Sequence, residues 1–143
     1  MQTMNDSGVE LRRLTMAFVS IDQRKFGCTS ARGRFAEEFA RLFCKWKGLA
    51  RASVKVLNEP RPKVGEASYL YGEYKAKTVY IYNLTPKRKR PVKLGVFMDT
   101  LIHELLHHYD QAIYGIDAMH DNNFYQRVDK IKKWLLPKEI YNV

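Results

Sequence analysis

Residues 94 to 114 form the longest helical pattern in the sequence, and a histidine motif lies on its polar face. Leu94, Phe97, Leu101 and Leu105 recur at steps of three and four, which places them on one side of a helix, and Gly115 is a typical stop. The opposite side is polar over four turns and carries Asp99, His103, His107, Asp110 and Tyr114. This division predicts a helix that packs on a core with one side and lines a cleft with the other.

The motif is HELLH (residues 103 to 107), which has the pattern H-E-x-x-H. Residues four apart lie one turn apart on the same helix face, so His103 and His107 can bind one metal ion. Glu104 is rotated by about 100° from His103, beside that ion, where a carboxylate can accept the proton of an activated water. We therefore expect a zinc site with Glu104 as general base. His108 lies towards the apolar side and is expected to pack or to support the site from behind.

A catalytic zinc ion takes three protein ligands and keeps one position for water. The fourth histidine, His120, stands thirteen residues after His107, beyond the expected end of the helix. That spacing lets the chain turn back, so His120 is the predicted third ligand. Carboxylates of the same region are the alternatives, namely Asp110, Asp117 and Asp121.

The rest of the chain predicts a single α+β domain over residues 1–143, since this length suits one hydrophobic core. Ser30 opens an amphipathic helix with an aromatic stripe that ends at Gly48. Segments 53–60, 66–74 and 77–83 predict two or three antiparallel strands in a small sheet. Asp121 or Asn122 caps a last helix that ends before Pro137. Residues 1 to about 12 are polar and are expected to form a flexible lead-in.

The cysteines and the hydropathy predict the compartment. Cys28 and Cys44 form neither a CxxC pair nor a disulfide framework, and are expected to be free thiols, buried or half-buried. No apolar stretch is long enough for a signal peptide or a membrane span. We therefore expect a cytoplasmic protein (nuclear in a eukaryote) that is neither secreted nor bound to a membrane.

The chain carries a net charge of +10, and such an excess on a small domain favours polyanionic partners. Five cations stand in the proline-bracketed segment LTPKRKRPVK (84–93), directly before the histidine helix. Lys87, Arg88, Lys89 and Arg90 are therefore candidate contacts to DNA phosphates. A solvated loop, with a charge that serves only solubility, is the alternative.

HELLH, followed after a dozen residues by His120 and then by Phe124, resembles the SprT-like (Spartan-type) zinc metallopeptidases. The order of helix, small sheet, basic loop and histidine helix is similar to that family from about residue 30 onward. The resemblance implies a zincin-like domain in which His103, His107 and His120 bind Zn²⁺ and peptide bonds are hydrolysed. In the best-known branch of the family, the substrates are proteins bound or crosslinked to DNA.

Two features depart from the family pattern. Many members have glycine on both sides of the third histidine, where this chain has Met119 and Asp121, so the local loop differs. Many members also carry a cysteine-rich zinc ribbon after the protease domain, and the sequence up to Val143 contains none. We therefore expect no nucleic-acid binding of the ribbon type.

These patterns together predict a zinc-dependent endopeptidase that acts on proteins bound to DNA. The substrate is expected to add as a strand against residues 77–83, with a tyrosine or His108 to stabilise the oxyanion. Tyr114, two turns beyond His107, is the weaker candidate for that role. Two alternatives stay open: a compact zinc peptidase without a nucleic-acid role, and a non-catalytic nucleic-acid-binding module with structural zinc. Glu104 favours an enzyme, because a structural zinc site needs no general base.

Overall fold

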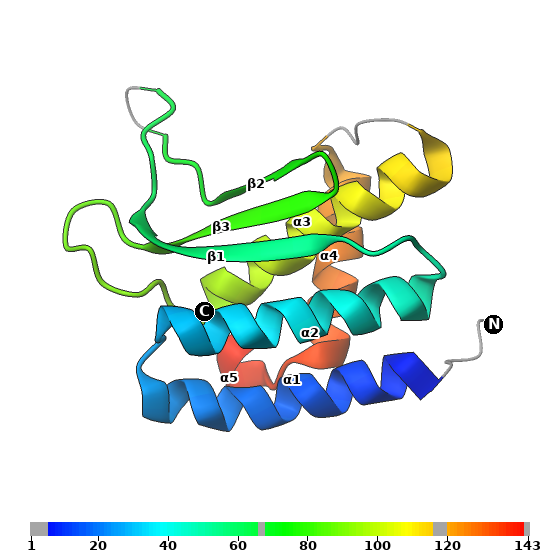
Figure 1. The fold of residues 1–143 in the computed structure, drawn as a ribbon, viewed down its shortest axis with the longest axis horizontal. Helices are drawn as coiled ribbons and strands as arrows, with labels where there is room; N and C mark the ends of the chain where they lie inside the picture. Colours follow the sequence, from blue (N-terminus) through cyan, green and yellow to red (C-terminus); the bar gives the residue numbers. More distant parts are fainter. Residues whose placement is uncertain (1–5, 66–67, 116–119, 142–143) are drawn as a thin grey trace.

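The computed structural model describes residues 6–65, 68–115 and 120–141, and it is an α+β domain, as predicted (Figure 1). No helix within these ranges is both long and apolar enough to cross a membrane. The elements follow in the order α1 (Asp6–Lys25), α2 (Thr29–Lys47), β1 (Ser53–Pro60), β2 (Gly72–Lys75), β3 (Thr78–Leu84), α3 (Leu94–Tyr114), α4 (Asn122–Leu135) and α5 (Lys138–Tyr141).

The three strands form a mixed sheet in the order β1-β3-β2. β2 runs antiparallel to β3, while β1 runs parallel to it, so the prediction of an antiparallel sheet is wrong for β1. The reason is that β2, which follows β1 in the chain, does not pair with β1 but lies one strand position away from it. β3 then returns between them, antiparallel to β2 and therefore parallel to β1. Only the turn at Ala76 and Lys77 joins neighbouring strands directly, and both residues have positive φ there, as a type I′ hairpin turn requires.

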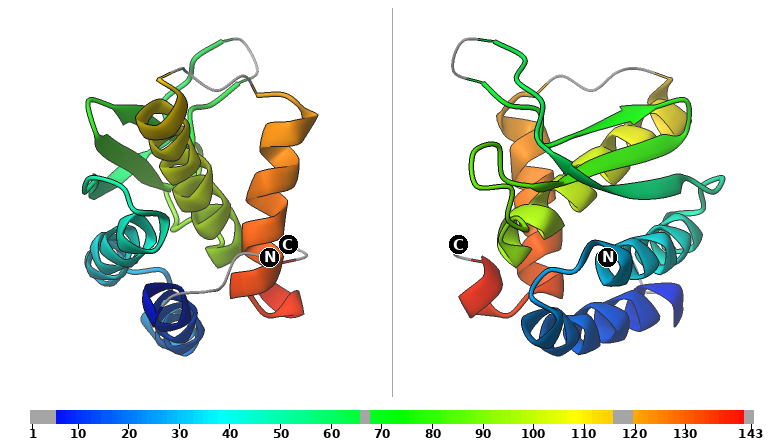
Figure 2. Two further views of the ribbon diagram at one scale, coloured as in Figure 1. Left: turned by 90° about the vertical axis from the view of Figure 1, so that its right-hand side faces the viewer. Right: turned by 60° about the vertical axis from the view of Figure 1, so that its left-hand side comes forward.

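One face of the sheet is buried, and α2 and α3 cover it (Figure 2). Val54, Val79 and Ile81 point into this face and are at most 3% exposed. The predicted aromatic stripe of α2 packs into the same core. On its other side α3 packs against α4, so the histidine helix lies between the sheet and the last helix (Figure 2).

The helix ends predicted from capping signals agree with the structure. Gly48 and Gly115 adopt left-handed conformations directly after α2 and α3, with φ of 69° and 66°. The carboxylate of Asp121 accepts a hydrogen bond from the backbone N–H of Phe124 at 2.9 Å, which caps α4. These caps fix where α3 stops and where α4 starts, and so they set the ends of the segment that leads to His120.

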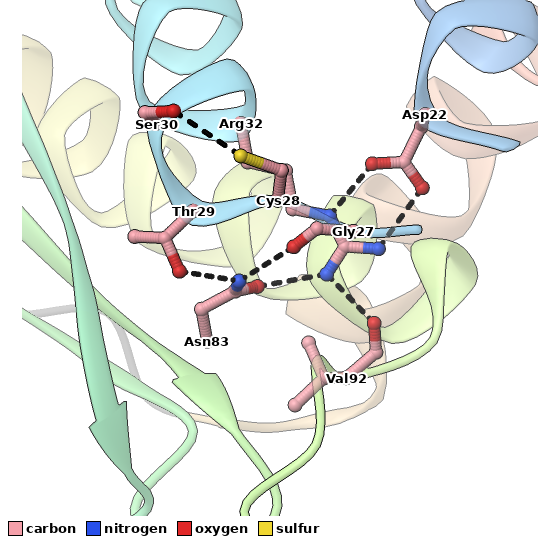
Figure 3. A network of polar contacts seen from close by, with 8 residues as sticks. All are labelled: Asp22, Gly27, Cys28, Thr29, Ser30, Arg32, Asn83 and Val92. Atoms are coloured by element: carbon pink, nitrogen blue, oxygen red, sulfur yellow. Dashed lines mark hydrogen bonds and ion pairs between the residues drawn. The ribbon is translucent and has the colours of Figure 1, made fainter. Parts of the chain in front are cut away.

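Two predictions about the first thirty residues are wrong. Residues 6–12, expected to be part of a flexible lead-in, belong to helix α1, which packs against α2. Small and polar residues occupy several buried positions of α1, which dilutes the apolar stripe in the sequence. Cys28 is exposed rather than buried or half-buried, because it lies at the corner between α1 and α2 with its sulfur 3.1 Å from the Ser30 hydroxyl (Figure 3). Cys44 is a buried free thiol, as predicted.

A buried guanidinium joins this corner to the rest of the fold (Figure 3). Arg32 on α2 is 2% exposed and donates to both carboxylate oxygens of Asp22 on α1, at 2.8 and 3.0 Å. It also donates to the side-chain oxygen of Asn83 on β3 and to the backbone carbonyl of Val92, each at 2.7 Å. One side chain therefore fixes α1, β3 and the segment that enters α3.

Candidate metal centre

Three histidine side chains meet at one point of the surface. His103 and His107 project from α3 one turn apart, and His120 approaches them from the residue before the cap of α4. The Nε2 atom of His103 is 3.2 Å from the Nε2 atoms of both His107 and His120, and the last two are 2.8 Å apart. The structure therefore brings together all three residues that the sequence predicted as ligands.

The spacing of these nitrogen atoms fits a tetrahedral metal ion. Nitrogen ligands at about 2.0–2.1 Å from a zinc ion stand roughly 3.3 Å apart. Burial, and then the neighbouring His107 and His120, lower the pKa of His103 to about 4, so its ring is neutral near pH 7. Neutral imidazole is the form that binds a metal. The three histidines are accordingly residues that could hold zinc, which accepts such a nitrogen set with one further position for water.

The ring of Phe124 packs against the rings of His103 and His107 and positions them. It is 1% exposed and lies in the first turn of α4. Its ring stacks on His107 with centroids 4.7 Å apart and meets His103 edge-on at 4.8 Å. Since the aromatic ring fills the space behind both imidazoles, it restricts their rotation and keeps their Nε2 atoms directed to the common point.

Glu104 lies beside the histidines in a buried position. It is 6% exposed, its Oε1 is 3.9 Å from the Nε2 of His103, and its Oε2 has no hydrogen-bond partner among the described residues. Burial raises the pKa of this carboxyl group to about 7, and the negative charge of Glu73 adds to the shift. A carboxyl group that is buried next to a cluster of metal-binding side chains is typical of an active site.

A cleft of about 540 Å³ opens next to the histidines. Residues 69–72 form one wall, and α3 forms the floor from Gly95 to Glu104. The other wall consists of His120, Tyr125 and Lys132. The cleft therefore runs from the histidines along α3 towards the start of that helix, parallel to the segment that leads into β2.

Gly72 permits β2 to lie against the face of α3 that carries Thr100 and Glu104. A Cβ atom at this position would stand 2.7 Å from Cγ2 of Thr100 and 2.7 Å from the backbone oxygen of Tyr80. It would also stand 3.7 Å from Cγ of Glu104. Only glycine allows this approach, so the sequence of β2 itself sets the distance between the sheet edge and Glu104.

The other candidates on α3 have structural roles. His108 is 1% exposed, with its ring nitrogens 2.8 Å from the Tyr74 hydroxyl and 2.8 Å from the Ala50 carbonyl, so it is packed, as predicted. This position excludes it as oxyanion stabiliser. The Asp110 carboxylate is buried and pairs with the guanidinium of Arg127 on α4. The ring of Tyr114 packs near Tyr109 and does not line the cleft.

Two of the carboxylates that are alternatives to His120 as third ligand, Asp117 and Asp121, follow α3 in the sequence. Asp121 is engaged as the cap of α4. Asp117 lies outside the described residues. The described alternatives, Asp110 and Asp121, are therefore both committed to other partners.

The predicted docking strand is wrong. β3 is the central strand, paired with β1 on one side and with β2 on the other, so it cannot accept a further strand. The edge that borders the cleft belongs to β2. Tyr82 donates its backbone N–H to Tyr71, and the alternation of antiparallel pairing then turns the backbone N–H and C=O of the next residue, Gly72, outward.

The sequence did not identify Tyr125 or residues 69–72 as parts of the cleft. Tyr125 is 50% exposed, and its ring lies 6.1 Å from that of His103 and 6.2 Å from that of His120. The signal that could have placed Tyr125 near the histidines is its position directly after Phe124, five residues beyond His120. Residues 69–72 carry no such signal, because their place beside α3 follows from the long excursion after β1.

The four cations of the basic loop are exposed, as predicted, and three of them line two different hollows, whereas Arg90 lines neither. Lys89 lines an open groove of about 1090 Å³ between α2 and β1, together with Arg34 and Lys55. Lys87 and Arg88 line a smaller hollow on the side of residues 69–71.

Comparisons of the chain with models of protein families, with curated proteins and with solved structures gave no match.

Proposed function

We propose that the protein is a zinc-dependent endopeptidase with a zincin-like, SprT-like fold. The observation that supports this most strongly is the meeting of three histidine Nε2 atoms beside a buried carboxyl group in one cleft. Three nitrogen ligands leave one coordination position open, which is the arrangement of catalytic zinc. A structural zinc site has four protein ligands and does not require a buried carboxyl group beside them.

Glu104 is the proposed general base. In the metal-free protein its pKa of about 7 lies close to neutral pH, where a residue that both accepts and returns a proton is most effective. Bound zinc would lower the pKa of a water towards ~7 and polarise the peptide carbonyl. Glu104 takes the proton as the water adds to the carbonyl carbon, and it returns the proton to the leaving amine.

The substrate lies along the outer edge of β2 in this proposal. The backbone groups of Gly72 pair with an extended peptide, as in other cases of strand addition to a sheet edge. Gly72 lines the cleft together with Glu104, so a peptide paired there passes the histidines. Tyr125, on the opposite wall, is the proposed donor to the oxyanion, because its ring lies beside both His103 and His120.

Metal content and hydrolysis test the proposal together. Elemental analysis of protein purified without added metal should find about one zinc per chain, and His120→Ala should lose it. Glu104→Gln should keep zinc and lose hydrolysis of a denatured protein substrate. The control is Glu37→Gln on the exposed side of α2, which should retain both. Undiminished zinc-dependent hydrolysis by Glu104→Gln would remove the general-base assignment, and absence of zinc from the wild type would remove the metal centre.

DNA is the proposed macromolecular partner, and the groove between α2 and β1 is its proposed surface. Arg34, Lys55 and Lys89 line this groove, and it is open enough for a backbone of successive phosphates. The affinity for a DNA duplex should fall steeply with salt, and Lys55→Gln/Lys89→Gln should reduce the salt dependence by about two counterions. The matched control, Arg24→Gln/Lys25→Gln on α1, removes the same charge elsewhere. A DNA affinity that does not respond to the groove variant would remove the groove as the surface, and absence of salt-dependent DNA binding would leave a compact peptidase without this partner.

A further inference from the structure

A second hollow, of about 420 Å³, adjoins the cleft on the side of the basic loop. Arg61 forms its base and lies over the ring of Tyr71, with the guanidinium carbon 3.9 Å from the ring centroid. Lys87 and Arg88 stand at its rim. Among the described residues, its lining combines three cations with aromatic side chains and contains no carboxylate.

Within the part of the chain that the structure describes, Arg61 has no anionic partner of the kind that a partly buried guanidinium normally has. Its Nε is buried and has no hydrogen-bond partner among the described residues, which also supply no carboxylate within 4 Å of it. Burial lowers the pKa of Arg61, opposed by Tyr71, which is the direction for a cation that has lost water without gaining an anion. A guanidinium binds carboxylate or phosphate oxygens through two parallel N–H groups, so this side chain is prepared for such a group.

The hollow continues the cleft of the metal centre. Tyr69 and Tyr71 line both of them, so the two spaces meet at these rings. The cleft floor extends along α3 from Glu104 back to Gly95. That stretch spans roughly 14 Å, which an extended peptide covers in about four residues. A polypeptide lying in the cleft therefore reaches Arg61 about four or more residues away from the bond beside the histidines.

We propose that Arg61, Lys87 and Arg88 bind a side-chain carboxylate of the polypeptide substrate, and that the enzyme selects substrates with Asp or Glu at a fixed distance from the scissile bond. This inference rests on the proposed peptidase function and names its substrate class. Arg61 and Tyr71 hold the acidic side chain at the base, and the two loop cations neutralise the charge from the rim.

A carboxylate fits this hollow better than a nucleic acid does. Three cations around one aromatic ring neutralise a single compact anion, whereas a nucleic-acid strand needs a groove that follows successive phosphates. The groove on the other side of the loop, lined by Lys89, has that open form. The structure thus gives the two halves of the basic loop to different ligands.

Cleavage-site profiling tests the inference directly. A library of peptides from a denatured proteome is incubated with the zinc-loaded protein, and the cleaved bonds are identified by mass spectrometry. Asp and Glu should be enriched about tenfold at one position, in line with a charge-assisted hydrogen bond. Arg61→Gln and Lys87→Gln/Arg88→Gln should each abolish the enrichment while cleavage continues. Arg24→Gln/Lys25→Gln should leave it unchanged, and the exposed double variant serves if Arg61→Gln does not fold.

A binding experiment separates failure of the inference from failure of the proposed function. Immobilised Glu104→Gln protein captures peptides from the same library without any need for turnover. Capture of acidic peptides that depends on Arg61, Lys87 and Arg88 supports the pocket even if the wild type hydrolyses nothing. Cleavage without a positional preference for Asp or Glu overturns the pocket and leaves the peptidase intact. Loss of single-stranded DNA binding in Lys87→Gln/Arg88→Gln, with no change in peptide selection, also overturns it.

Discussion

At the scale of single residues, Glu104 has the environment that departs most from that of a surface carboxylate. It is 6% exposed, and one of its oxygens has no partner among the described residues. A helical side chain at this position normally turns away from the core or finds a hydrogen-bond donor. Its retention in the interior therefore costs stability, as is common for groups at functional sites, and this agrees with the proposed role as general base.

The cost of Glu104 should appear in the pH dependence of the metal-free protein. The pKa is 4.5 ordinarily and about 7 in the folded state, so the folded state holds the proton more tightly over this interval. The free energy of unfolding should therefore decrease as pH rises from 4.5 to 7. Glu104→Gln lacks this loss, so its stability relative to wild type should increase by roughly 2–3 kcal/mol between pH 4.5 and pH 8. Urea unfolding with a chelator present measures the difference, and a difference that is constant with pH would contradict the burial argument.

At this scale the sequence identified the three histidines that the structure brings together, but not their surroundings. The i and i+4 spacing fixes His103 and His107, and the scarcity of histidine singled out His120. Tyr125 and Arg61 were not recognised, because a tyrosine or an arginine acquires its role from neighbours that are distant in sequence. The unpartnered state of Arg61 Nε, for example, depends on where the segment after β1 lies.

At the scale of elements, the packing of α4 against α3 brings the three histidines together. Two ion pairs join the helices, Asp110 with Arg127 near one end and Asp99 with Lys132 near the other. Along α3, His103 and His107 lie between these two ion pairs, whereas on α4 both ion pairs follow Phe124. The two ion pairs hold α4 against α3, and Phe124 contacts both histidines of α3, so packing between the helices helps to set the position of His120.

Phe124 should be more important for the metal than for the helix that carries it. Phe124→Leu keeps an apolar side chain and should cost about 1 kcal/mol of stability, whereas Phe124→Ala should cost roughly 3–5 kcal/mol. Both remove the ring that stacks on His107, so both should weaken zinc binding. Competition with a chromophoric chelator measures the affinity. Val128→Ala, one turn further along the same buried stripe of α4, is the control. Equal loss of zinc affinity there would assign the effect to general loosening of α4.

The elements themselves differ in how well sequence predicts them. α2, α3 and α4 carry periodic apolar stripes; α2 and α3 end at a glycine and α4 begins at the cap Asp121, and these signals are local. α1 buries Ser7, Thr15 and Asp22, and Asp22 is tolerated inside only because Arg32 neutralises it from another helix. The direction of β1 relative to β3 depends on a connection whose path no local pattern specifies.

At the scale of the whole molecule, the N-terminal helices and the metal centre are linked through one buried charge. Arg32 joins Asp22 on α1, Asn83 on β3 and the backbone at Val92, which directly precedes α3 (Figure 3). Gly27, at the corner between α1 and α2, lies so close that an added Cβ would stand 2.6 Å from Cβ of Pro91. The start of α3 is thus held against the corner.

Removal of one partner of this network should destabilise the entire domain. Asp22→Asn leaves the guanidinium of Arg32 buried without its carboxylate, and we expect a loss of about 3–5 kcal/mol in the free energy of unfolding. Guanidinium-chloride unfolding should show a lower midpoint with one cooperative transition. Glu37→Gln, an exposed carboxylate on α2, should change stability by less than about 0.5 kcal/mol. A loss below ~1 kcal/mol in Asp22→Asn would mean that Asn83 and Val92 alone suffice to hold Arg32.

The three histidines come from two separate segments, so a bound metal would cross-link these segments in addition to its proposed chemical role. His103 and His107 belong to α3, and His120 precedes α4, so occupancy of the site ties together segments that otherwise separate on unfolding. Each tenfold excess of free zinc over its dissociation constant adds about 1.4 kcal/mol to the folded state. A chelator should therefore withdraw stability together with the proposed activity, and the lifetime of the folded protein would become a readout of the metal supply around it.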